Sequence, residues 1–142
     1  MNEEQASEEQ AVCLEAAEVE FERFVEAMDL DLGLEDMDAE DLTAFKKVKR
    51  RFLKAVGNGS LIINEKGEAV FTPQRIDDAK AITFHERRGS DLMAMDGKKS
   101  TQDIAKTFAI MGSICRVHPN VFSKLGSSDL SICQGIYLLL MD

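Results

Sequence analysis

Aromatic residues are scarce in this sequence of 142 residues: there is no tryptophan, one tyrosine and 6% aromatic residues in all. Recognition of a ligand by ring stacking therefore has few side chains to use. The three cysteines, Cys13, Cys115 and Cys133, are odd in number and far apart. A chain of this length buries enough surface to fold without disulfides. We therefore expect reduced thiols in a cytoplasmic protein.

Long apolar runs are also absent. The longest one, around Ile136 to Met141, is far shorter than the roughly 20 residues of a membrane-spanning helix. The opening residues Met1 to Glu4 contain neither the basic nor the apolar region of a secretory signal. These features predict a soluble intracellular protein without a membrane partner.

Charge is distributed unevenly along the chain. The net charge is −9, but residues 1–41 hold 16 Asp or Glu and one base, Arg23, which gives −15. Residues 42–142 hold 16 bases and 10 acids, which gives +6. Such asymmetry indicates an acidic arm beside a more basic body. We therefore predict an acidic helical arm over residues 1–41 and a core domain over residues 42–142.

Two helices are predicted in the first 57 residues, because apolar side chains recur every three or four positions. The first spans about residues 8–28 and has Leu14 on its apolar stripe. The acidic segment 29–41 is a predicted loop, after which Asp38 or Asp41 caps a helix that ends with Gly57 as its left-handed closing residue. The two helices, one acidic and one basic, are expected to pack together as a hairpin.

The next segments alternate with the period of a strand. Leu61 to Asn64 and Ala69 to Thr72 flank a turn in which Gly67 supplies the positive φ of a β-hairpin. Residues 81–85 form a third predicted strand with no assigned partner. The remainder is predicted to be helical, including a helix opened by Ser100. The expected fold is therefore α+β: a small antiparallel sheet of a β-hairpin plus one strand, with a C-terminal helical cluster.

Spacings that could hold a metal are incomplete. Asp29, Asp31 and Glu40 match the outer positions of a calcium loop, but Gly33 and Leu34 occupy the positions where an acid and a glycine belong. Four zinc ligands could in principle come from the side chains Cys115, His118, Cys133 and His85. Both cysteines lie on apolar helical stripes, where a thiol acts as a small hydrophobe. We predict no metal, no cofactor and no catalytic residue.

The strongest local signal is a run of six cations between Lys46 and Lys54 on the outer face of the second helix. Three interpretations are open. The acidic arm can neutralise the cations, and can shield them until it is displaced. A protein partner can bind them, or they can follow a phosphate backbone, as in a nucleic-acid-associated regulatory protein. The candidate contact residues are Lys46, Lys47, Arg50 and Arg51.

One resemblance covers residues 58–142. Five elements follow one another in order before a terminal helix. They are the hairpin, the strand Ala81 to Phe84, the segment Glu86 to Asp96, the helix around Thr107 to Cys115 and the turn Val117 to Phe122. This succession resembles the tail assembly chaperones of long-tailed bacteriophages.

The resemblance implies a non-enzymatic helper that binds the long helical tape measure protein, with the tail tube protein as a second partner. It also implies action in the host cytoplasm and absence from the mature virion. A homo-oligomer is compatible with this function. An enzyme with no recognisable site remains a third class.

The terminal helix is the expected partner-binding element, because apolar residues surround it on nearly every side. The candidates are Ile136, Leu138, Leu139 and Met141. In a helix the 100° step places Leu138 and Leu139 on different faces, so both cannot point at one core layer. The alternative is a terminal helix that is simply buried.

Overall fold

The structure is a computed structural model that describes residues 3–95 and 103–141. Within these residues the chain forms six α-helices, two 3₁₀ turns and one three-stranded sheet, so the α+β prediction is confirmed. The elements are α1 (Glu3–Ala27), η1 (Leu34–Asp36), α2 (Ala39–Gly57), β1 (Leu61–Ile63), β2 (Ala69–Phe71), β3 (Ile82–Phe84), α3 (Gly89–Leu92), η2 (Met93–Met95), α4 (Asp103–Cys115), α5 (Asn120–Ser123) and α6 (Ser127–Met141).

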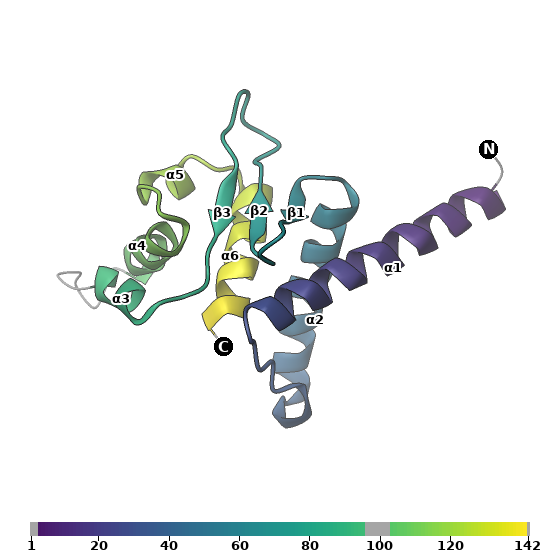
Figure 1. The fold of residues 1–142 in the computed structure, drawn as a ribbon, viewed down its shortest axis with the longest axis horizontal. Coiled ribbons are helices and arrows are strands. Elements are labelled where there is room, and N and C mark those ends of the chain that lie inside the picture. Colours follow the sequence, from purple (N-terminus) through teal and green to yellow (C-terminus); the bar gives the residue numbers. More distant parts are fainter. Residues whose placement is uncertain (1–2, 96–102, 142) are drawn as a thin grey trace.

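Helix α1 is longer than predicted, and its two halves differ. The first half extends away from the rest of the molecule (Figure 1). The second half enters the hydrophobic core, where Phe21, Phe24 and Met28 are buried. Leu14, expected on the apolar stripe, is 55% exposed and lines a hollow between α1 and α2. The acidic segment therefore contributes directly to the core.

The start of α2 follows one of the predicted alternatives, since the Asp38 carboxylate accepts a hydrogen bond of 2.8 Å from the Asp41 backbone N–H. Its predicted end is wrong. Gly57 is the last helical residue, Asn58 follows as the cap, and the left-handed residue is Gly59, with φ of 84°. The left-handed glycine after the helix is therefore Gly59, two positions after the predicted Gly57.

The acidic and basic helices pack together as predicted. The ring of Phe52 lies 5.1 Å from that of Phe21 and 5.4 Å from that of Phe24, measured between centroids. Next to these rings the Lys49 ammonium lies 3.1 Å from the Glu18 carboxylate. Both side chains are partly exposed, and such a pair adds only about 0 to 1 kcal/mol. The aromatic contacts therefore carry most of the stability of this interface.

The sheet has the order β1-β2-β3, and both pairs of strands are antiparallel. The hairpin is confirmed, and its turn uses Gly67 with φ of 81°. The third strand, whose partner the sequence left open, pairs with β2. The hairpin turn also holds α1: a Cβ on Gly67 would lie 2.1 Å from Ala27 Cβ, and the Arg23 guanidinium donates to the Asn64 carbonyl over 3.0 Å.

The C-terminal cluster closes the other side of the core. Helix α4 packs against β3, while α6 lies along α2 (Figure 1). The fully buried Asp91 joins α3 to α4, accepting from the Ser113 hydroxyl at 2.6 Å and from the Arg88 backbone N–H at 2.7 Å. The predicted start of this helical region at Ser100 lies outside the described residues.

None of the described helices is both long enough and apolar enough to pass through a lipid bilayer.

Candidate partner-binding surface

The four candidate residues of α6 divide into two groups. Ile136 and Leu139 are buried, with Leu139 only 2% exposed. Both side chains already pack in the core, and that they also contact a partner stays a prediction. Leu138 is 54% exposed and Met141 is half-buried. The prediction that Leu138 and Leu139 point in different directions is confirmed.

The approach of α6 to α2 explains which side of α6 is covered. The two helices run antiparallel and come closest where Gly135 faces Val48. A Cβ on Gly135 would lie 3.3 Å from the nearest Val48 methyl group, which is a tight contact. Glycine at this position lets the two helices approach closely. Away from this point the helices separate, and a hollow opens on each side of it.

The first of these, which we name the apolar hollow, has a volume of about 390 Å³ and lies beside the last turns of α6. It is lined by Met37, Asp41, Ala44, Phe45, Val48, Leu138 and Leu139. Ala44 and Leu138 are exposed, and Phe45 and Val48 are half-buried. Exposed apolar surface of this kind is typical of a contact site for another protein.

The cations of α2 lie outside the apolar hollow, with Lys46 and Arg50 on the side of α1 and Arg51 on the side of α6. Lys46, Lys47, Arg50 and Arg51 are exposed, and none of these four forms an ion pair with another described residue. Lys49 differs, since it pairs with Glu18 and its ammonium lies 5.2 Å from the Phe21 ring centroid. Among the described side chains, α1 therefore forms an ion pair with Lys49, while Lys46 and Arg50 line a hollow beside Leu14 and Glu18 of α1 without an ion pair.

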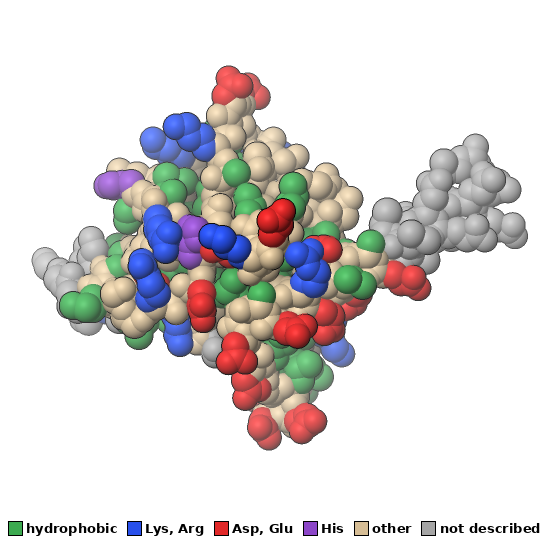
Figure 2. Space-filling view, in the orientation of Figure 1, with side chains coloured by type: hydrophobic (Ala, Val, Ile, Leu, Met, Phe, Trp, Pro, Cys, Tyr) green, Lys and Arg blue, Asp and Glu red, His purple; other side chains and the backbone are tan. Residues whose placement is uncertain are grey.

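Acidic side chains remain concentrated at one end of the molecule. Figure 2 shows them at the lower end of the view, over the α1–α2 connection and the start of α2. The carboxylates of this connection are exposed. The acidity of the first part of the sequence therefore persists as an acidic surface at this end, while basic and acidic side chains are mixed over the middle of the same view.

The two described thiols lie in the core. Burial raises the pKa of Cys133 to about 12, and burial with the nearby Cys133 raises the pKa of Cys115 well above its usual range. Both are therefore protonated at neutral pH, and a thiol is a poor nucleophile and metal ligand. The side chain of Cys13 lies outside the described part of the chain.

The two histidines that were weighed as zinc ligands each contact another group and not the thiols. His85 Nδ1 is 2.6 Å from the Glu68 carboxylate, whereas His118 Nδ1 accepts from the Asn120 backbone N–H at 3.1 Å. Among the residues that the structure describes, no group of three or more His, Cys, Asp or Glu side chains is arranged to hold a metal ion.

Comparison with known proteins adds no relative: no protein family, curated protein or solved structure matches the chain.

The sequence analysis missed the contribution of α2 to the apolar surface. Phe45 and Val48 recur at the apolar spacing by which the second helix was predicted, which indicates packing against the core, and the structure also places them at the edge of the apolar hollow. The available signal was Ala44 beside them, because a small residue there widens the apolar face. Gly135 and Val48 are 87 positions apart, and no pattern in a single sequence indicates that they face each other.

Proposed function

We propose that this protein is a non-enzymatic tail assembly chaperone that binds a helical segment of a phage tape measure protein. The observation that carries the proposal is the apolar hollow, in which an exposed leucine of α6 lies beside apolar side chains of α2. A chaperone for long helical chains needs such a surface, because the apolar stripe of its client must be covered until assembly.

Two further features support this function. The ordered succession of elements over residues 58–142 resembles that of tail assembly chaperones. The exposed cations Lys47 and Arg51 lie on the α2 face that adjoins α6, where they can contact acidic residues flanking the apolar stripe of a client helix. By the same resemblance the protein acts in the host cytoplasm, also meets the tail tube protein, and is absent from the mature virion.

The test is co-expression with the tape measure chain, with the soluble fraction of that chain as the readout. Leu138→Glu places a charge in the apolar hollow and should reduce this fraction severalfold, without changing the thermal midpoint of the protein itself. Ile104→Glu is the matched control, because Ile104 is 70% exposed on α4, outside the hollow. Equal solubility with both variants and with the unchanged protein would contradict the proposal.

A second candidate function is nucleic-acid binding by a regulatory protein. The observation in its favour is the set of four exposed cations on α2, Lys46, Lys47, Arg50 and Arg51. Binding of this kind weakens steeply with salt, because each phosphate contact releases a counterion. Retention on DNA at low salt that is lost at moderate salt, and lost on replacing Lys46 and Arg50 with Gln, would favour this function. Absence of retention at low salt would exclude it.

A further inference from the structure

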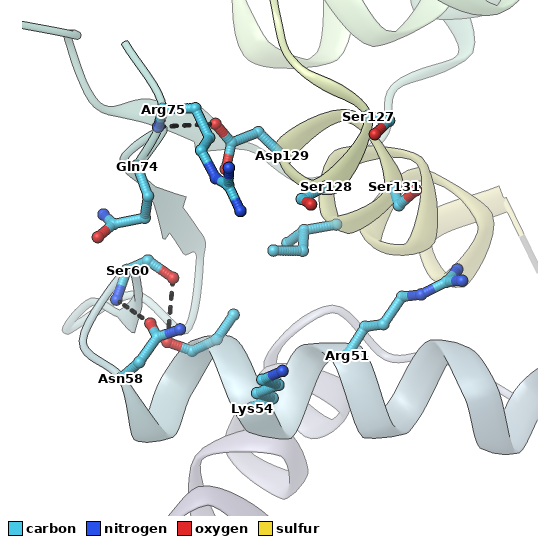
Figure 3. A pocket seen from close by; sticks show the side chains of 12 residues that line it. Arg51, Lys54, Asn58, Ser60, Gln74, Arg75, Ser127, Ser128, Asp129 and Ser131 are labelled. Carbon is cyan, nitrogen blue, oxygen red and sulfur yellow. Dashed lines mark hydrogen bonds between the residues drawn. The ribbon is translucent and has the colours of Figure 1, made fainter. Parts of the chain in front are cut away.

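A second hollow lies on the other side of the Gly135–Val48 contact, where α2 ends and α6 begins (Figure 3). We name it the basic hollow. It has a volume of about 560 Å³, which is within the size range of small-molecule sites. Its walls come from four parts of the chain: the end of α2, the connection between α2 and β1, the connection between β2 and β3, and the first turns of α6.

Three cations line the basic hollow. Arg51 and Lys54 are three positions apart on α2, and Arg75 belongs to the β2–β3 connection. Lys54 and Arg75 point into the hollow from opposite sides, while Arg51 extends along its edge toward Ser131 (Figure 3). None of these three side chains has an ion-pair partner among the described residues.

One carboxylate, that of Asp129, also lines the hollow, and it already has a structural role. The Asp129 side chain is buried, and its Oδ2 accepts from the Arg75 backbone N–H at 3.2 Å. This bond joins the start of α6 to the β2–β3 connection. The charges on the described lining residues therefore sum to +2, three cations less one carboxylate.

The α6 wall supplies neutral donors. The hydroxyl groups of Ser127, Ser128 and Ser131 line the hollow, and Asn58 and Gln74 contribute amides from the opposite wall. The first hydrogen bond within α6 is donated by the Leu130 N–H to the Gly126 carbonyl, at 2.9 Å. The preceding N–H groups have no acceptor inside the helix, and they carry the positive end of the helix dipole. Anions are favoured at such a position, and here cations from two other segments surround it.

We propose that the basic hollow binds a small phosphate anion, either inorganic phosphate or pyrophosphate. Near neutral pH a phosphate monoanion or dianion would neutralise much of the lining charge of +2, and its oxygens accept from guanidinium, ammonium and hydroxyl groups at once. No aromatic ring belongs to the described lining, so the site lacks a surface on which a nucleobase could stack. The phosphate group itself is therefore the recognised feature.

This site is separate from the apolar hollow on which the proposed chaperone function rests, and Arg51 is the one residue that both proposals use. The apolar hollow and the basic hollow lie on opposite sides of the Gly135–Val48 contact and share no lining residue among those that the structure describes. Phosphate binding can therefore hold or fail whether or not Leu138 contacts a client.

The experiment is titration of the full chain with sodium phosphate and with sodium pyrophosphate at constant ionic strength, by calorimetry. Sodium chloride is the reference. Arg75→Gln should weaken binding about five- to tenfold, because it removes a charged donor while retaining the backbone bond to Asp129. Lys46→Gln is the matched control, since Lys46 is an exposed cation of α2 outside the hollow, and it should change the affinity less than twofold. Equal thermal midpoints establish that both variants fold.

Three results would overturn the proposal. The first is no binding of either anion up to about 10 mM. The second is an equal loss of affinity in Arg75→Gln and Lys46→Gln, which would indicate nonspecific attraction to net charge. The third is binding of single-stranded DNA, but of neither small anion, that depends on Lys46 and not on Arg75. That result would place phosphate recognition on the outer face of α2.

Discussion

Helix α2 contacts α1 on one flank and α6 on the other, and the two contacts are filled to different degrees. On the α1 flank, phenylalanine rings pack at centroid distances of 5.1 and 5.4 Å, and the hairpin turn presses against the end of α1. One hollow of about 320 Å³ lies on this flank, beside Leu14 and Glu18. On the α6 flank, the close approach of Gly135 and Val48 is bordered by a hollow on each side. The comparison shows how one helix can both secure the fold and present surface to ligands.

The largest effect should come from placing a charge on the buried side of α6. Leu139→Glu introduces a carboxylate at a position that is 2% exposed, and should cost more than about 4 kcal/mol of unfolding free energy. Leu138→Glu should change it by less than about 0.5 kcal/mol, because the side chain is exposed. Urea unfolding of both variants measures the difference. Equal destabilisation would mean that α6 is simply core.

Truncating phenylalanines next compares the centre of the α1 flank with its edge, where the Phe45 ring lies 6.5 Å from that of Phe21 and also lines the apolar hollow. Phe24 is fully buried, so Phe24→Ala should lower the unfolding free energy by about 3 to 5 kcal/mol. Phe45 is half-buried at the edge of the apolar hollow, and Phe45→Ala should cost about 1 to 2 kcal/mol. Chemical unfolding curves give both values. A larger loss at Phe45 would contradict the view that the centre of the α1 flank is the better packed part.

Two glycines give a finer test. Gly67→Ala should destabilise by about 2 to 3 kcal/mol, since φ is positive and the new methyl group would overlap Ala27. Gly135→Ala should change stability by no more than about 1 kcal/mol, because better helix propensity offsets a tight contact with the Val48 methyl group. Thermal unfolding measures the stability of both variants. A larger loss in Gly135→Ala than in Gly67→Ala would mean that the α6 flank is the more tightly constrained one.

The smallest effect is a pH dependence beside the hairpin that holds α1. Burial raises the pKa of Glu68, but hydrogen bonds from Asn64 and His85 and the charge of His85 outweigh it and leave the pKa lowered. A lowered pKa stabilises the fold above the unfolded value of about 4.3, and this contribution is lost as pH falls below it. Between pH 5 and pH 3 the unchanged protein should lose more unfolding free energy than Glu68→Gln does. Denaturant unfolding of both proteins at each pH measures this difference. Parallel profiles would contradict this assignment.

Local features of the fold were predictable from the sequence, because each depends on neighbouring residues. Gly67 marks the hairpin turn, Asp38 was among the predicted helix caps, and the 100° step separates Leu138 from Leu139. The end of α2 was misplaced by two positions, because Gly57 and Gly59 both suit a helix terminus and Asn58 between them can also cap.

Long-range features could not be predicted. Nothing local indicates that Arg75 and Asp129, 54 positions apart, meet at one hollow, or that Leu14 stays exposed beside α2 while Phe21 enters the core. Such contacts depend on how the elements assemble in three dimensions. The sequence therefore identified the candidate residues of α6 as one set. The structure separates the buried members of that set from the exposed or half-buried ones.

Hydrogen–deuterium exchange on the complex with a tape measure chain tests most directly whether the α2–α6 flank is the binding surface. The account predicts slower exchange on complex formation in residues 131–141 and 44–51, with no change in α4. Slower exchange confined to α4, with residues 131–141 unchanged, would contradict it.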